Sequence, residues 1–156
     1  MRLEYFQMID RVVAIDADAR LIRTASTVPQ QSTIFEGHFP TYPLMPGVLL
    51  TECMAQTVGW LISVIVGFTT MPILVGVKEA KFRTLVLPGD ALEFDGKIVH
   101  EGSGFIVGGC QGLRGGQKVC DAQLTYRMMP FASPQFREAL LEWAQRINVP
   151  VGEFIK

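Results

Sequence analysis

His38 and Glu52 are the side chains of this sequence best suited to acid–base chemistry. His38 lies in a proline-rich segment, and Glu52 follows it near the beginning of the most apolar part of the chain. An unpaired carboxylate there costs several kcal/mol when ionised, so we expect Glu52 to be partnered, protonated or used in chemistry. The simpler alternatives are a structural or exposed His38 and a Glu52 that complements the positive end of a helix dipole.

Three further residues extend from Glu52 along one stripe of the helix that we expect to start near residue 47. They are Gln56, Gly59 and Ser63, and they form a polar or small seam on an otherwise apolar helix. This seam indicates a site at the helix N-terminal end with a narrow channel for an apolar substrate beside it. Close packing of the helix on a strand would use small residues equally well, so both interpretations stay open.

The helix start adds a third chemical group. Unpaired backbone N–H groups near Gly47 could hold an oxyanion that develops on a carbonyl oxygen. A histidine, a carboxyl group and oriented N–H donors can remove a proton next to a carbonyl and expel a β-hydroxyl group. The residues therefore favour a lyase hypothesis, although no spacing rule brings His38 and Glu52 together in space.

Composition limits the class of protein. The chain has 156 residues without a visible linker, so we expect a single domain over 1–156. Fourteen Lys and Arg balance fifteen Asp and Glu, which argues against nucleic-acid binding. A mean hydropathy of +0.28 indicates apolar surface at a membrane or a subunit interface. Residues 53–77 carry no charge, but polar residues and Pro72 interrupt them, so we predict a central helix wrapped by a sheet, with no membrane span.

The cysteines and the N-terminus suggest a compartment. Cys53, Cys110 and Cys120 are odd in number and lack the spacing of a metal site or redox motif, so we interpret them as small buried hydrophobes. The N-terminal residues are too charged for a signal peptide. Together these features predict a cytoplasmic protein.

The order of the elements predicts an α+β layout. Residues 11–16 and 20–28 read as a hairpin, prolines make 35–46 an irregular loop, and a long helix runs from Gly47 to about residue 66. Four strands follow at 73–83, 91–100, 104–113 and 117–129, and Ser133 caps a terminal helix. We expect that helix to bury one face, formed by Phe136, Leu140, Trp143, Ala144 and Ile147.

The sequence resembles a known family in three places. Residues 35–56, FEGHFPTYPLMPGVLLTECMAQ, resemble the active-site segment of (3R)-hydroxyacyl-[acyl-carrier-protein] dehydratases of the FabZ type, roughly GHFPGxPxxPGVLxxEAxAQ. MIDRV at 8–12 and KEAKFRTLVLPGDAL at 78–92 resemble two further family segments. The resemblance covers about residues 5–128 and implies a hotdog fold, in which an antiparallel sheet wraps one helix and dimerises edge to edge.

The resemblance also implies roles for individual residues. His38 corresponds to the catalytic histidine and Glu52 to the catalytic carboxylate, which in this family come from different subunits. A glutamate here favours the FabZ branch over the isomerising FabA branch. The remaining matches are the oxyanion and substrate-binding residues Gly47, Gln56, Phe39 and Pro46.

The implied partner is an acyl carrier protein that carries the substrate as a thioester. Lys78, Lys81 and Arg83 are candidates to contact that acidic protein, with solvated strand ends as the alternative. No metal or dissociable cofactor is implied, and the assembly could be a homodimer or a trimer of dimers. A hotdog acyl thioesterase, an enoyl-CoA hydratase and a non-catalytic acyl-binding subunit remain alternatives.

Two departures from the family pattern affect these expectations. Thr41-Tyr42 replaces the usual Gly-x between two prolines, which puts the fit of the substrate beside His38 in doubt. The segment 132–150 lies beyond the typical family end and forms a C-terminal helical extension. We expect this extension to pack on its own subunit, with an oligomer contact or the carrier-protein surface as alternatives.

Overall fold

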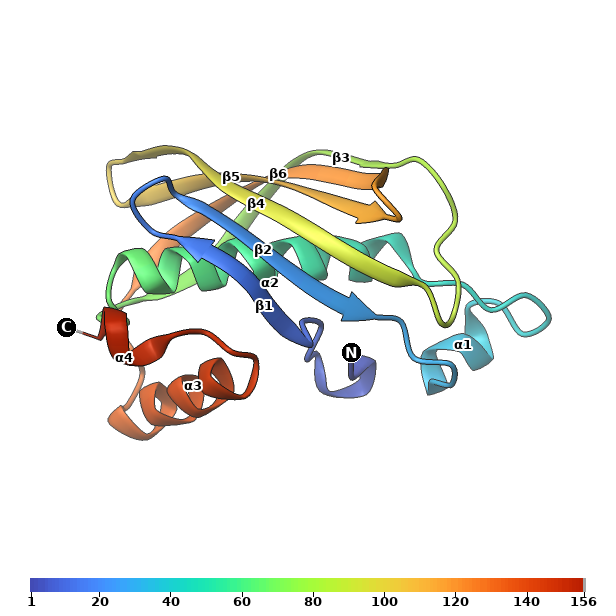
Figure 1. The fold of residues 1–156 in the computed structure, drawn as a ribbon, viewed down its shortest axis with the longest axis horizontal. Helices are drawn as coiled ribbons and strands as arrows, with labels where there is room; N and C mark the ends of the chain where they lie inside the picture. The colour runs from blue at the N-terminus through green and yellow to red at the C-terminus, as the bar shows by residue number, and fades with distance from the viewer. Residues whose placement is uncertain (156) are drawn as a thin grey trace.

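A computed structural model describes residues 1–155 as one curved antiparallel sheet wrapped around a long helix, α2 (Gly47–Ile65) (Figure 1). The sheet has six strands in the order β1-β2-β4-β5-β6-β3, and every neighbouring pair is antiparallel. This arrangement confirms the predicted α+β class and hotdog fold. The strands are β1 (Arg11–Asp16), β2 (Leu21–Thr27), β3 (Met71–Phe82), β4 (Ala91–Gly102), β5 (Phe105–Arg114) and β6 (Gln117–Met129).

Helix α2 occupies the centre of the molecule because nearly its whole circumference is apolar. Pro46 stands at its N-cap, and the chain turns at Gly67, whose φ of 62° lies in the left-handed region. The helix is long and apolar enough to cross a membrane, but 67% of its most apolar window is buried inside the protein. Burial in the core of a folded domain therefore explains why this helix is so apolar.

Glycines on the sheet let α2 approach closely. A Cβ atom added to Gly108 of β5 would overlap Cγ1 of Val58, and one added to Gly96 of β4 would lie 3.2 Å from Cγ2 of Thr57. Both contacts are shorter than packed side chains tolerate. Side chains on the sheet-facing side of α2 therefore pack directly against the backbone of β4 and β5 at these glycines.

The expectation of an irregular loop over 35–46 is wrong at its beginning. A short helix, α1 (Thr33–Gly37), extends into that range, and Ser32 caps it by accepting a hydrogen bond from the Ile34 N–H at 3.1 Å. The prolines that disfavour helix begin only at Pro40, so they leave these residues free to form one turn. A 3₁₀ turn η1 (Leu3–Tyr5) and the short helix α4 (Val151–Phe154) were also not predicted.

The C-terminal helix α3 (Pro134–Arg146) begins as predicted, with Ser133 Oγ accepting from the Phe136 N–H at 3.2 Å. It packs on its own chain, where Ala144 and Ile147 belong to the hydrophobic core. Phe136 is a correction to the predicted buried face, because it is 43% exposed and contacts Phe131 instead. Its position in the first turn places it beyond the edge of the core.

Candidate functional site

Glu52 lies in the second turn of α2, half-buried, and it has a hydrogen-bond partner. Nε2 of Gln56, one turn further along the helix, donates to Oε1 of Glu52 at 2.9 Å. The carboxyl group is thus paired with a neutral amide rather than with a cation. It remains a group that can accept or deliver a proton.

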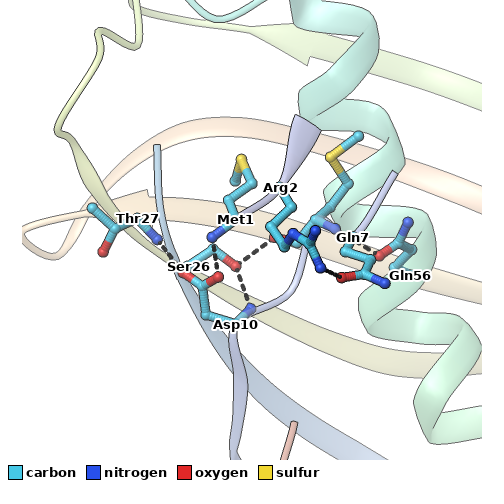
Figure 2. A network of polar contacts seen from close by, with 8 residues as sticks. Met1, Arg2, Gln7, Asp10, Ser26, Thr27 and Gln56 are labelled. Atoms are coloured by element: carbon cyan, nitrogen blue, oxygen red, sulfur yellow. Dashed lines mark hydrogen bonds and ion pairs between the residues drawn. The ribbon is translucent and has the colours of Figure 1, made fainter. Parts of the chain in front are cut away.

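The N-terminal segment fixes the orientation of the Gln56 amide. Its Oε1 accepts from the Met8 N–H at 3.1 Å (Figure 2). Its Nε2 also donates to the Phe6 carbonyl at 2.6 Å. A backbone N–H only donates and a carbonyl only accepts, so the amide cannot be turned over without losing both bonds. The NH₂ group therefore points at Glu52.

The same segment is in turn anchored to the sheet, as Figure 2 shows. Ser26 Oγ donates to the Met8 carbonyl at 2.7 Å, and the Thr27 N–H donates to Oδ2 of Asp10 at 2.8 Å. The amino terminus of Met1 pairs with Asp10 as well. Sequence reasoning missed this support because its partners are far apart along the chain. The MIDRV motif was its only visible signal.

A cavity of about 240 Å³ opens beside Glu52 and follows α2. Its wall includes every residue of the predicted seam, and it is otherwise mostly apolar. A Cβ atom added to Gly59 would have no atom within 4 Å, so this glycine faces open space. The structure thereby favours the channel over close helix–strand packing. The lining residues are Glu52, Ala55, Gln56, Gly59, Trp60, Ser63, Met71, Pro72, Ile73, Leu74, Tyr126, Leu140 and Trp143.

Tyr126 is a member of this wall that the sequence did not single out. Its hydroxyl donates to the Ala55 carbonyl at 2.8 Å, and burial raises the pKa of that hydroxyl well above its usual value. Tyr126 therefore stays neutral and holds β6 against α2. Its place in a run of alternating strand residues gave no hint of a site.

His38 ends helix α1 and is half-buried. Its Nδ1 lies 3.2 Å from the Leu44 carbonyl, which can only accept, so this bond places the ring proton on Nδ1. In the neutral form of this ring, Nε2 carries the lone pair that a general base needs. The Phe39 ring stacks on the imidazole with centroids 4.5 Å apart, and Phe39 itself is 52% exposed.

One chain does not bring all the predicted site residues together. In the described chain, His38, Phe39, Pro46 and Gly47 are absent from the cavity wall that contains Glu52 and Gln56. Gly47 begins α2, where the first N–H groups lack intrahelical acceptors. A Cβ at this position would lie 3.1 Å from the Phe82 ring, so glycine lets β3 approach the helix start.

The predicted basic residues lie at the end of β3 and after it. Lys78 and Lys81 are exposed. Arg83 forms an ion pair with Asp121, with Nη2 2.5 Å from Oδ1, so this guanidinium already has an anionic partner. Two of the three side chains are thus available at the surface, and the third is held in an ion pair.

Strand β3 is an open edge of the sheet. It pairs with β6 alone among the strands of residues 1–155, and its other side carries no partner. The exposed apolar side chains Ile73, Val75 and Val77 follow this edge. An apolar, unpaired edge strand is suited to pairing with another chain.

Comparisons with known proteins identify a family and several structures that this chain resembles. The sequence model of the family described as "FabA-like domain" matches residues 2–123. Similar solved structures include a protein of Streptococcus mutans bound to acetyl CoA, with 18% identity and a TM-score of 0.61 over 79% of this chain and 90% of that one. A hypothetical thioesterase of Streptococcus pneumoniae, solved with coenzyme A, has 16% identity and a TM-score of 0.60 over the same shares. A Pseudomonas aeruginosa protein has 19% identity and a TM-score of 0.60 over 76% and 87%. At these identities the likeness supports the fold alone.

Proposed function

Because the chain belongs to the FabA-like domain family, we propose that it dehydrates (3R)-hydroxyacyl thioesters on acyl carrier protein to trans-2-enoyl thioesters. One observation carries this proposal. Glu52 stands at one end of an apolar cavity, with an amide whose orientation is fixed by two backbone bonds. Such a site accepts an apolar tail and presents a proton-transfer group to its polar head.

In the proposed reaction, Nε2 of His38 removes the proton from C2 of the substrate. The electron pair of that C–H bond forms the C2–C3 double bond as the C3–O bond breaks. Glu52 delivers its proton to the departing hydroxyl, directly or through water, and water leaves. The Gly47 N–H holds the thioester oxygen on which charge develops.

The histidine of each site is supplied by a second copy of the chain in this proposal. His38 is absent from the cavity wall of its own chain, and the apolar edge of β3 offers a surface for sheet continuation. Phe39 and Pro46 would then contact the substrate beside the histidine. Lys78 and Lys81, with Arg83 near them, would meet the acidic carrier protein.

Turnover of hydroxyacyl and trans-2-enoyl carrier-protein substrates tests the chemistry. We expect Glu52→Gln and His38→Ala to lose about 10²–10⁴-fold in rate, the usual contribution of a general acid or base. Glu142→Gln, the same change at an exposed position of α3, should keep full activity. Full activity in Glu52→Gln would refute the proposed role of the carboxyl group.

Mixing the two inactive variants tests the shared site. A dimer of one His38→Ala chain and one Glu52→Gln chain retains one site with both groups intact. Random mixing should therefore restore about a quarter of wild-type turnover, since half of the dimers are mixed. No recovery, with mixed dimers present, would show that both groups act within one chain.

Thioester hydrolysis is a second candidate, because the Streptococcus pneumoniae structure is described as a hypothetical thioesterase. The two reactions differ in what they need from the substrate. Dehydration requires the 3-hydroxyl group, whereas hydrolysis does not. Release of free thiol from a saturated acyl thioester would favour the hydrolase, and stoichiometric carrier-protein binding without any turnover would indicate an acyl-binding subunit.

A further inference from the structure

Helix α3 closes one side of the cavity that contains Glu52. Leu140 and Trp143 of α3 line it together with residues of α2, and the Trp143 ring meets the Trp60 ring edge-on at 5.2 Å. Figure 1 shows α3 below α2, with β4, β5 and β6 above it. This helix lies beyond residues 2–123 that the family model matches, so this wall is a feature that the family match does not account for.

Helix α3 is held in place at both ends. Near its start, Nε of Arg137 donates to the Phe68 carbonyl at 2.8 Å, in the turn that follows α2. Just past its end, the Ile147 carbonyl accepts from the Val12 N–H of β1 at 2.6 Å. Ala144 lies buried between these anchors, and the Ile147 side chain is buried at the second one. Leu140 and Trp143 therefore form a fixed wall.

The interior of the cavity is suited to an apolar tail. The two hydroxyl groups of its wall already donate to helix carbonyls, Ser63 Oγ to Gly59 at 2.9 Å and Tyr126 to Ala55 at 2.8 Å. Glu52 is the one charged residue among those that line the cavity, so the substrate head group is expected at its end. From Glu52 to Ser63 the wall follows α2 for about 16 Å.

We propose that α3, through Leu140 and Trp143, sets the length of acyl tail that this cavity accepts. The inference rests on the proposed function, because the tail is that of the thioester whose 3-hydroxyl group lies at Glu52. The tail extends along α2 from Glu52 and ends against the α3 wall. Removing side-chain volume from that wall lengthens the accepted tail, and adding volume at Gly59 shortens it.

Binding of saturated acyl thioesters of N-acetylcysteamine measures the limit without any turnover. Both tryptophans of the chain line the cavity, so their fluorescence reports its occupancy directly. In the wild type, affinity should rise about fourfold with each methylene group that the cavity buries and level off at a limiting length. Affinity that is independent of tail length would overturn the proposal.

Variants locate the limit. In Trp143→Ala and in the milder Leu140→Ala, the limit should move to longer tails, with a gain of at least about tenfold for two extra methylene groups. In Gly59→Leu it should move to shorter tails. Glu142→Ala, an exposed neighbour on the same helix, should leave it unchanged. An unchanged limit in a folded Leu140→Ala or Trp143→Ala variant, as judged by circular dichroism, would overturn the proposal.

Turnover and binding separate this inference from the function on which it rests. A wild type that dehydrates hydroxyacyl substrates, but whose length limit ignores α3, would refute the inference and leave dehydration standing. Suppose instead that the limiting tail length changes in the α3 variants but that the protein has no dehydratase turnover. This result would support the role of α3 in setting tail length and refute the proposed reaction.

Discussion

Glycines have opposite effects on the two sides of helix α2. On the side that faces the sheet, a Cβ atom at Gly108 would overlap Val58, so the missing side chain lets helix and strand touch. On the side that faces α3, a Cβ atom at Gly59 would meet nothing within 4 Å, so the missing side chain leaves room. The side of α2 that faces the sheet, here called the packed side, is therefore in close contact with it. The side that faces α3, here called the hollow side, borders the cavity, and Glu52 lies on it.

The largest expected effect is on the packed side. Gly108→Val should lower the free energy of unfolding by about 3 kcal/mol, because its side chain must displace Val58. Thermal unfolding would register this as a fall of roughly 2–4 °C for each kcal/mol. Gly109→Val, on the same strand, is the matched control, since a Cβ there makes an ordinary 3.4 Å contact with Val99. Equal losses in both variants would show that close packing at Gly108 is not the cause.

The next largest expected effect on stability concerns a pair of buried hydroxyl groups on the packed side. Thr57 Oγ1 lies 2.8 Å from Thr24 Oγ1, and both residues are fully buried. Thr57→Val should cost about 1–3 kcal/mol in chemical denaturation, because it leaves the Thr24 hydroxyl without a partner. On the hollow side, Ser63 is also buried, but its hydroxyl bonds only to the Gly59 carbonyl of its own helix. Ser63→Ala leaves no polar side chain without a partner, so it should cost less, about 0.5–1 kcal/mol. Equal losses of stability in Thr57→Val and Ser63→Ala would contradict the proposed difference between the two sides.

Filling the hollow side should stabilise the protein. Gly59→Ala adds a methyl group to open space and replaces a poor helix former, so we expect a gain of about 1 kcal/mol in the free energy of unfolding. The same thermal scan that detects the loss at Gly108 checks this gain. A loss of stability at Gly59 would mean that this side of the helix is packed after all.

At neutral pH the smallest effect comes from the thiols buried in the core, because their contribution changes only in alkaline solution. Burial raises the pKa of Cys53 and Cys110 well above the usual value and that of Cys120 to about 11. Folding therefore retains thiol protons that the unfolded chain loses above its ordinary pKa near 9. Stability should fall as pH rises from about 9 towards 11. At pH 8 a disulfide reagent should react slowly with the native protein and rapidly in denaturant, and equal rates would contradict this.

Much of this architecture was readable from local pattern. The apolar run after Pro46 predicted α2, and the four later strands agree with the structure to within a few residues, because turn residues separate them clearly. Ser133 and Pro134 marked the start of α3 correctly. Helix α1 was missed, since a single capped turn before Pro40 gives little periodic signal.

The sequence by itself determined the chemical groups, in that His38, Glu52 and the seam of Gln56, Gly59 and Ser63 were evident from residue type and helical spacing. Only the tertiary structure decided what surrounds them. It brought the N-terminal segment to Gln56, placed Trp143 across the cavity and left space at Gly59. Helical spacing relates residues that are three or four positions apart, whereas these contacts join segments far apart in the chain, and distances of that kind are set only when the core packs.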